Sequence, residues 1–293
     1  MTAQLSWPQN ARIALSIVVN VEEGAEMSVV DGDRGPEPVD ELGLVLKKPI
    51  RNLGNESNYL YGIKAGAPRV FELLRKHDIK ATITAAARSL ERAPDLAAVI
   101  VDDGHEICCH GYRWVHQFQM DEDTERDFIG SAVSSLERTT GTRPLGWLSR
   151  YLASPNTRRL LTEAGFLYHM DDYSDDFPFW SSESERPIVI MPYAIDTNDM
   201  KLWAAPAYTP EDWLRYAVET FDWLYREGET APKMMSLGLH LRVIGRPGRI
   251  GYLERFIEHV LRHDNVWIAT RQEIAQYFAA VRPFQSSEAG GKT

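Results

Sequence analysis

The chain has few cysteines, no excess of positive charge and no long hydrophobic run. Its two cysteines, Cys108 and Cys109, are adjacent and cannot form an ordinary framework of structural disulfides, which favours a reducing cytoplasm. The formal net charge of -10 argues against a nucleic-acid partner, because phosphate binding requires clustered cations. The N-terminus lacks a basic region followed by an apolar one, and no apolar run approaches the roughly 20 residues of a membrane helix. We therefore expect a soluble cytoplasmic protein with no nucleic-acid or membrane partner.

Strand and helix patterns alternate along the sequence, and 44% apolar residues suffice for a large core. Repeated strand–helix units predict an α/β fold with a closed or distorted parallel barrel, in one domain over residues 1–282. Residues 25–65, rich in Gly, Pro and Asp, are expected to form an irregular functional loop, and residues 283–293 a flexible tail. The predicted strands are 12–19, 81–85, 106–109, 146–148, 166–169, 188–191, 233–239 and 266–268, and the predicted helices are 68–77, 94–101, 121–140, 154–163, 209–227 and 249–262.

Carboxylates and imidazoles follow several of the predicted strands. Glu22 and Glu23 come directly after the apolar run of the first strand, where α/β enzymes hold their chemistry. His110 follows the strand at 106–109, and His240 ends the apolar stretch that begins at Met234. Adjacent glutamates are more often a solvated surface pair, but their place at the end of a buried strand favours a site. The pattern indicates a hydrolytic centre.

Several longer motifs resemble the polysaccharide deacetylase superfamily. The resemblance covers roughly Trp7 to Tyr277 and implies a deformed (β/α) barrel with a single deacetylase-like catalytic domain. The motifs, in chain order, are Glu22-Glu23, Gly104-His-Glu-Ile-Cys-Cys-His110, Arg143-Pro-Leu-Gly-Trp147, Ser154-Pro-Asn-Thr-Arg-Arg-Leu-Leu161 and Leu239-His240.

Within the superfamily, the chain is similar to the branch that opens small cyclic amides, the cyclic imide hydrolases and the metal-independent allantoinases. This resemblance implies a hydrolase of C–N bonds in cyclic amides, and it suggests a homotetramer. The exposed aromatic residues expected to suit a subunit interface include Trp203, Trp213, Trp223 and Tyr225. The motifs that carry the resemblance are Asn20-Val-Glu-Glu-Gly24, His110-Gly-Tyr-Arg-Trp-Val-His116, Asp196-Thr-Asn-Asp199 and Gly238-Leu-His-Leu-Arg-Val-Ile-Gly-Arg-Pro-Gly248.

The sequence departs from the sugar deacetylases at the positions that would bind zinc. Those enzymes place two aspartates after the first strand, one as base and one as metal ligand, and use a His-x-x-x-His pair. This chain has two glutamates, and Trp114 stands four residues after His110. Catalytic zinc requires three protein ligands and an open position for water. No cofactor is expected; if zinc does bind, its ligands would be Glu23, His110 and His116.

Cyclic imides are reactive enough to open without a metal, because two carbonyls share one nitrogen lone pair. A carboxylate base, an oxyanion stabiliser and a proton donor then suffice. We expect Glu22 to activate water and His240, or His110, to protonate the departing nitrogen. Since Glu23 is adjacent, one carboxyl of the pair should have a raised pKa near the working pH, as suits a base.

Further residues are candidates for substrate binding. Trp114 could form an aromatic wall for a flat ring, although packing is its more common role. His116 and Asp199 could contact the substrate, or could orient a loop and form a turn. Arg150 and Arg242 could bind carbonyl groups or the carboxylate product, although Arg242 belongs to what would ordinarily be a solvated basic run.

Four functions remain in order of preference. The loop at 147–154 is more apolar than the polar ureido arm of allantoin requires, which favours a simple cyclic imide opened to a half-amide. Allantoin hydrolysis comes second and zinc-dependent N-deacetylation third. A non-catalytic barrel that serves as a scaffold is the alternative outside enzymology. The expected partner is a small cyclic imide or ureide.

Overall fold

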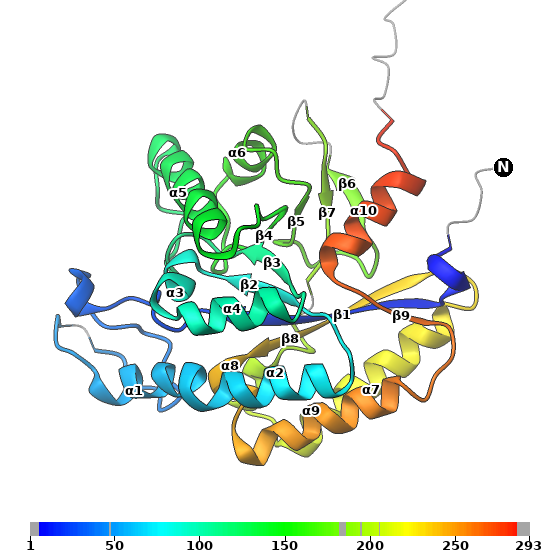
Figure 1. Cartoon of the computed structure of the whole chain (residues 1–293), viewed down its shortest axis with the longest axis horizontal. Coiled ribbons are helices and arrows are strands. Elements are labelled where there is room, and N and C mark those ends of the chain that lie inside the picture. The colour runs from blue at the N-terminus through cyan, green and yellow to red at the C-terminus, as the bar shows by residue number, and fades with distance from the viewer. Residues whose placement is uncertain (1–5, 47, 182–185, 194, 205, 286–293) are drawn as a thin grey trace, which may run out of the picture.

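The structure is a computed structural model and describes residues 6–46, 48–181, 186–193, 195–204 and 206–285. Strands and helices alternate through most of this range (Figure 1). The strands are β1 (Ile13–Val21), β2 (Thr82–Ala85), β3 (Glu106–Cys109), β4 (Gly146–Trp147), β5 (Tyr168–His169), β6 (Phe179–Ser181), β7 (Ile188–Ile190), β8 (Lys233–His240) and β9 (Val266–Ile268). The α-helices are α1 (Leu53–Tyr61), α2 (Ala67–Lys76), α3 (Ala87–Arg92), α4 (Pro94–Asp102), α5 (Glu122–Thr140), α6 (Thr157–Glu163), α7 (Pro210–Glu227), α8 (Leu241–Ile244), α9 (Pro247–Val260) and α10 (Arg271–Val281).

One sheet organises the molecule. In the described chain, eight of its nine strands follow the order β6-β7-β5-β4-β3-β2-β1-β8, and the ninth, β9, pairs with the beginning of β1. Every pairing is parallel except that of β6 with β7. All nine residues of β1 are buried, as expected for a central strand of a parallel sheet covered on both faces.

The sheet does not close into a complete barrel, because β6 and β8 are its two ends. Connecting segments cross the opening: the N–H of Met234 donates to the carbonyl of Asp176, and Asn198 forms an isolated bridge with Gly238. The predicted α/β fold with a deformed barrel is confirmed in this half-barrel form.

Helices cover the sheet from several sides (Figure 1). In this view α7 and α9 lie beneath β1 and β8, while α5 and α6 lie at the opposite end of the molecule. Local sequence fixes where the long helices begin. Thr209 and Asp212 form a reciprocal capping box at the start of α7, and the carboxylate of Asp121 accepts the N–H of Thr124 at the start of α5.

Some elements differ from the sequence prediction. The segment 25–65 is not irregular throughout, because it contains α1 and most of the π-helix η3 (Gly62–Gly66). The sequence analysis also missed α3, α10 and the edge strand β6. Thr270 and Glu273 form a capping box at the start of α10, a signal that the sequence does contain. Residues 286–293 of the expected tail lie outside the described residues.

The aromatic residues proposed for a subunit interface are not all exposed. Trp213 is only 1% exposed and belongs to the core, whereas Trp223 is 58% exposed. Large exposed aliphatic residues are instead frequent between residues 30 and 60. The exposed aliphatic residues of this segment are Val30, Leu42, Leu44, Val45, Ile50, Leu53 and Leu60.

No described helix is both long enough and apolar enough to cross a membrane.

Candidate active site

Three parallel strands deliver side chains to one edge of the sheet. Glu22 follows the last residue of β1, His110 follows the last residue of β3, and His240 is the last residue of β8. Their side chains converge because the carboxyl ends of parallel strands meet at one edge and Asn20 pairs with His240 across β1 and β8. All three side chains are buried. The structure therefore brings these predicted residues together.

Glu22 lies at the centre of this group. Its Oε1 atom is 3.3 Å from Nε2 of His240 and 3.6 Å from Nε2 of His110. Its Oε2 atom accepts a hydrogen bond from Nη1 of Arg242 at 2.8 Å. One carboxylate oxygen thus contacts a buried guanidinium, and the other faces two imidazoles.

Glu23 points away from this group although it is adjacent in the chain. Its Oε1 atom accepts the backbone N–H of Arg242 at 3.3 Å, and its Oε2 atom accepts the backbone N–H of Glu22 at 3.1 Å. The carboxyl group also fills the space beside Gly62, where a Cβ atom would collide with it. Glu23 therefore braces β1 against η3 rather than facing the imidazoles.

The two glutamates have opposite pKa shifts. Burial alone would raise the pKa of Glu22, but the positive charges of His240 and Arg242 hold it well below its ordinary value. Burial raises the pKa of Glu23, and repulsion from Glu22 adds to this effect against the attraction of Arg242. One pKa of the pair is raised, as the sequence predicted, but it is not that of Glu22. The residue proposed as base is an ionised carboxylate held by cations.

Asp199 orients His240 and supports its charge. Oδ1 of Asp199 lies 2.7 Å from Nδ1 of His240, and Oδ2 accepts the backbone N–H groups of His240 and Ile244. Burial alone would lower the pKa of His240, but the charges of Glu22 and Asp199 raise it to about 9. The ring is therefore an imidazolium at neutral pH, with one N–H toward Asp199 and the other available on the side of Glu22.

Two neighbours fix the orientation and the tautomer of His110. Its Nδ1 atom is 2.6 Å from the carbonyl oxygen of Leu148, which can only accept. Its Nε2 atom is 3.1 Å from Nε1 of Trp114, which can only donate. These partners require the neutral tautomer with hydrogen on Nδ1. Trp114 thus uses the lone pair that a zinc-binding histidine would offer.

The residues named for zinc do not form a ligand set. Glu23 faces backbone amides, His110 accepts from Trp114, and Nδ1 of His116 lies 3.3 Å from the carbonyl oxygen of Arg150. Their donor atoms are not among the groups of three or more within 4.8 Å of one another in the described chain. Zinc catalysis needs three such atoms around one ion, so this donor set does not fit the metal.

A cavity of about 430 Å³ opens beside Glu22 and the two imidazoles. Trp114 and Leu148 supply apolar wall, while His116 and Tyr151 lie at its exposed rim. Pro38 and Val39, from the segment 25–65, line it from another side. The volume suits a small-molecule ligand with a few fixed polar contacts.

Arg150 lines the cavity, and both of its Nη atoms already donate to groups of the protein. Its Nη1 and Nη2 atoms contact the two oxygens of Glu37 at 2.8 and 2.5 Å, and Nη1 also donates to the carbonyl of Trp114. The guanidinium stacks over the indole of Trp114 at 3.8 Å. Both charged groups are buried. This pair fastens the segment 25–65 to the site.

Arg242 does not line the cavity. Its guanidinium lies behind Glu22 and over the ring of Tyr59 at 4.2 Å, and Nη1 is 3.5 Å from Oε1 of Glu23. It therefore neutralises the glutamate pair from the protein side. The remaining basic residues of that run hold the segment 25–65, since Arg246 donates to Asn58 and Arg249 lies near Glu41.

Sequence reasoning missed Tyr193 and Asn198. Both line the cavity, and the hydroxyl of Tyr193 accepts from the amides of Asn20 and Asn198, each at 3.2 Å. Within the described chain that hydroxyl has no acceptor for its own hydrogen, which leaves a donor for a ligand. Asn198 belongs to the Asp-Thr-Asn-Asp motif, so a signal existed for it, whereas Tyr193 had none.

Comparisons with known proteins agree with this architecture. A family model described as polysaccharide deacetylase matches residues 58–169. A Schizosaccharomyces pombe protein assigned to the polysaccharide deacetylases is 35% identical, over 96% of this chain and 94% of its own. The chain belongs to the polysaccharide deacetylase family.

Two crystal structures resemble this polysaccharide deacetylase family member closely. One is a Pseudomonas aeruginosa protein assigned to the same family, at 43% identity and a TM-score of 0.91, covering 95% of each chain. The other is PuuE allantoinase, also at 43% identity and a TM-score of 0.91, covering 95% of this chain and 94% of its own. Both agree with the branch expected from the motifs. Membership supports a hydrolase that acts on C–N bonds.

Proposed function

We propose that this family member opens the ring of a small cyclic imide, hydrolysing one C–N bond to a half-amide without a metal. One arrangement carries the proposal. The ionised carboxylate of Glu22 and the imidazolium of His240 lie 3.3 Å apart on the wall of a small cavity. A base and an acid of this kind are the groups that ring opening requires.

In the proposed reaction, Glu22 takes a proton from water while the water oxygen attacks one ring carbonyl. His240 gives its Nε2 proton to the ring nitrogen as the C–N bond breaks. The products are a carboxylic acid, which releases its proton to solvent, and a primary amide. One water molecule is consumed and no oxidant or reductant is needed.

The low pKa of Glu22 is compatible with this role. That pKa is held down partly by the charge of His240, and the charge disappears when the imidazolium gives up its proton. The carboxyl group of Glu22 then holds its new proton more strongly. After product release, that proton can return to His240 across the 3.3 Å contact and restore the starting state.

The proposal assigns the neutral residues of the cavity to binding. Trp114 would form a flat wall against the imide ring, and Tyr193 would donate its free hydrogen to a ring carbonyl. A cyclic imide needs less electrophilic help than a sugar acetamide, because its nitrogen lone pair is shared by two carbonyls. The commitment of His110 to Trp114 also supports a reaction without zinc.

Allantoinase activity is the second candidate, and the similarity to PuuE allantoinase favours it. Against it, the ureido arm of allantoin needs additional hydrogen-bond partners. Arg150 is a charged donor in the cavity lining, but three of its hydrogen bonds already go to Glu37 and the carbonyl of Trp114. Leu148 makes the adjoining wall apolar, which suits a smaller ring.

A substrate panel tests the proposal. Rates would be measured for succinimide or maleimide, allantoin and an acetylated chitooligosaccharide, before and after treatment with a chelator. Imide turnover that survives the chelator, with the highest kcat/KM of the panel, supports the proposal. A preference for allantoin would select the second candidate. Action on the oligosaccharide alone, lost with the chelator, would contradict both.

We also propose a cytoplasmic location and self-association, as a homotetramer. Cys108 and Cys109 are free and buried, which suits a reducing compartment. Seven exposed large aliphatic side chains lie between residues 30 and 60. Aliphatic groups in that number on one segment are typical of a surface that another subunit covers.

A further inference from the structure

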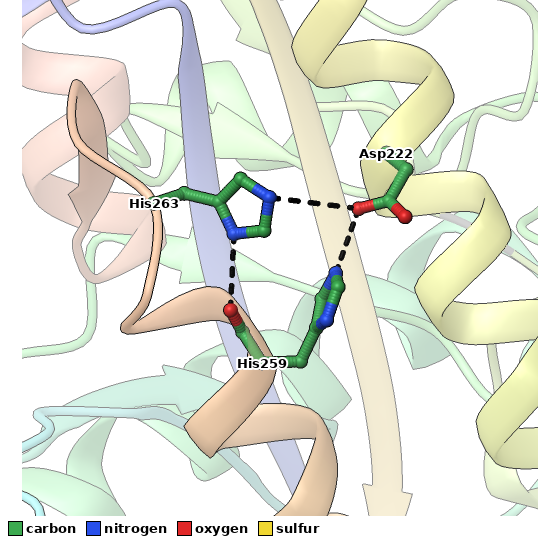
Figure 2. A group of neighbouring side chains, drawn as sticks. All are labelled: Asp222, His259 and His263. Carbon is green, nitrogen blue, oxygen red and sulfur yellow. Dashed lines mark hydrogen bonds and ion pairs between the residues drawn. The ribbon is translucent and has the colours of Figure 1, made fainter.

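We propose a second, unassigned site in this protein: a binding site for a zinc-like divalent transition-metal ion, formed by Asp222, His259 and His263. Asp222 lies on α7, His259 near the end of α9, and His263 just after that helix. Figure 2 shows the carboxylate and the two imidazoles facing one another between these segments. One donor atom from each residue lies within 4.8 Å of the other two.

The spacing follows from the way α9 ends. His259 is in the last turn of α9, and His263 is in the hydrogen-bonded turn that follows it, which brings the two rings together. Their centroids are 4.8 Å apart. Because α7 packs beside α9, Asp222 reaches both rings. Two imidazoles and one carboxylate are a donor set that suits zinc and leaves positions for water.

The hydrogen bonds of His263 direct its Nε2 lone pair toward Asp222. Its Nδ1 atom is 3.0 Å from the carbonyl oxygen of His259, which can only accept, so hydrogen resides on Nδ1. The lone pair of a neutral His263 is then on Nε2, and this atom faces Oδ1 of Asp222 at 3.9 Å. That distance is too long for a hydrogen bond. A metal ion between them would accept the Nε2 lone pair of His263 and would bind Asp222 in place of the hydrogen bond that its Oδ1 atom now accepts from His259.

The surroundings already orient the ligands. A histidine that binds a metal usually donates its other N–H to a carbonyl or carboxylate, as His263 does here. Nε2 of His259 is 2.7 Å from Oδ1 of Asp222, so this ring also points toward the centre. The ring of Phe221 meets both imidazoles edge to face, and Tyr225 packs in the same manner against His263.

The position separates this site from the candidate active site. The chain leaves His240 at the carboxyl end of β8, and α9 then runs back toward the other edge of the sheet. β9 follows His263 and pairs with Ile13 at the beginning of β1. The three side chains are 45%, 26% and 27% exposed, so a dissolved ion can reach them. A bound ion would link α7 to α9 and stabilise the folded chain.

Calorimetric titration of the chelator-treated protein with Zn²⁺ tests the inference, and Co²⁺ absorption reports the ligands. The wild type should bind one equivalent, and Zn²⁺ should raise its Tm. His263→Ala and Asp222→Asn should weaken this binding by more than the ~10- to 100-fold loss caused by removing an outer partner of a ligand. Both substitutions are at partly exposed positions, and the Tm without metal would verify that each variant folds.

Two controls make the result specific. His77→Ala removes another histidine at a helix end, whose Nε2 has no hydrogen-bond partner among the described residues, and should leave Zn²⁺ binding unchanged. His110→Ala should also keep the bound equivalent, because His110 belongs to the other edge of the sheet. Unchanged affinity in His263→Ala would overturn the inference, as would loss of the equivalent in His110→Ala alone.

Discussion

The Nε2 atom of His240 lies 3.3 Å from Oε1 of Glu22, while Nδ1 of the same ring lies 2.7 Å from Oδ1 of Asp199. The imidazole therefore bridges two carboxylates that come from distant parts of the chain. This bridge gives the site an acid and a base in direct contact. The charges on either side of the ring also decide the pH range over which each group is in the state that the reaction needs.

Asp199→Asn should move the alkaline limb of the pH profile of kcat/KM to lower pH. The imidazolium of His240 is present below its pKa of about 9 and is lost as the pH rises through that value. Asp199 contributes to the raised pKa through its charge, so the neutral amide should lower it. The cyclic imide itself also loses a proton in alkali. The pKa of the free substrate does not depend on the enzyme variant, so Asp199→Asn would not move a limb caused by that ionisation. An unmoved limb would argue against His240 as the acid.

Loss of either partner of the Arg150–Glu37 pair should destabilise the fold strongly. Arg150→Met or Glu37→Gln would leave one buried charge without its partner, which costs about 3–5 kcal/mol. The double variant should cost less than the sum of the two. Denaturant unfolding measures these free energies. The KM for the imide should also rise, because Pro38 and Val39 belong to the segment that Glu37 fastens.

A surface ion pair provides the control for that experiment. Arg126 and Glu163 are joined at 2.6 Å, but their side chains are 46% and 36% exposed. The matching substitutions there should change the free energy of unfolding far less than those at the buried pair, because solvent screens exposed charges. Equal changes in the free energy of unfolding at the two pairs would contradict the claim that burial makes the Arg150–Glu37 pair important for stability.

Trp114→Phe should reduce both stability and activity while it keeps an aromatic wall. The substitution removes the indole N–H and leaves the buried Nε2 of His110 without a donor, at a cost of about 1–3 kcal/mol. Denaturant unfolding and kcat/KM measure the two effects. Trp223→Phe, at an exposed position, is the matched control and should change neither. If Trp114→Phe kept the stability and the kcat/KM of the wild type, the proposed importance of the hydrogen bond from Trp114 to Nε2 of His110 would be contradicted.

Leu42→Asp together with Leu44→Asp should shift the protein to a smaller assembly. These side chains are 90% and 52% exposed, and a charge on each would oppose burial against another subunit. Light scattering coupled to gel filtration measures the mass. Thr142→Asp, at an exposed position outside this segment, and Thr139→Asp, in the last turn of α5, control for added charge. An unchanged mass would remove residues 30–60 from the interface.

The sequence was sufficient to predict most of the sheet. Runs of apolar and β-branched residues such as Ile13–Val19 are buried on both faces, so their pattern is determined locally. The edge strand β6 and helix α1 were missed because they carry less of that pattern. The side chain of Asn52 caps α1, but that helix buries only Asn55 and Tyr59, so its sequence shows no clear apolar face.

The sequence was sufficient to predict which residues form the candidate site, but not which of its two glutamates has the lowered pKa. Glu22, His110 and His240 were found because each follows a recognisable strand. The division of roles between Glu22 and Glu23 depends on Arg242, about 220 residues away in the chain, and no local pattern reveals that contact. The same holds for Arg150, which the sequence suggests as a substrate ligand and the structure pairs with Glu37.

The general base provides the most direct test of the account. The measurement is kcat/KM for succinimide with chelator-treated Glu22→Gln, compared with Glu23→Gln and the wild type. Loss of the base at Glu22 should reduce the value by about 10²- to 10⁴-fold with the folded far-ultraviolet spectrum retained. Glu23→Gln should lose far less, because the pKa of Glu23 is raised and its carboxyl group faces backbone amides. Near wild-type turnover by Glu22→Gln would contradict the account.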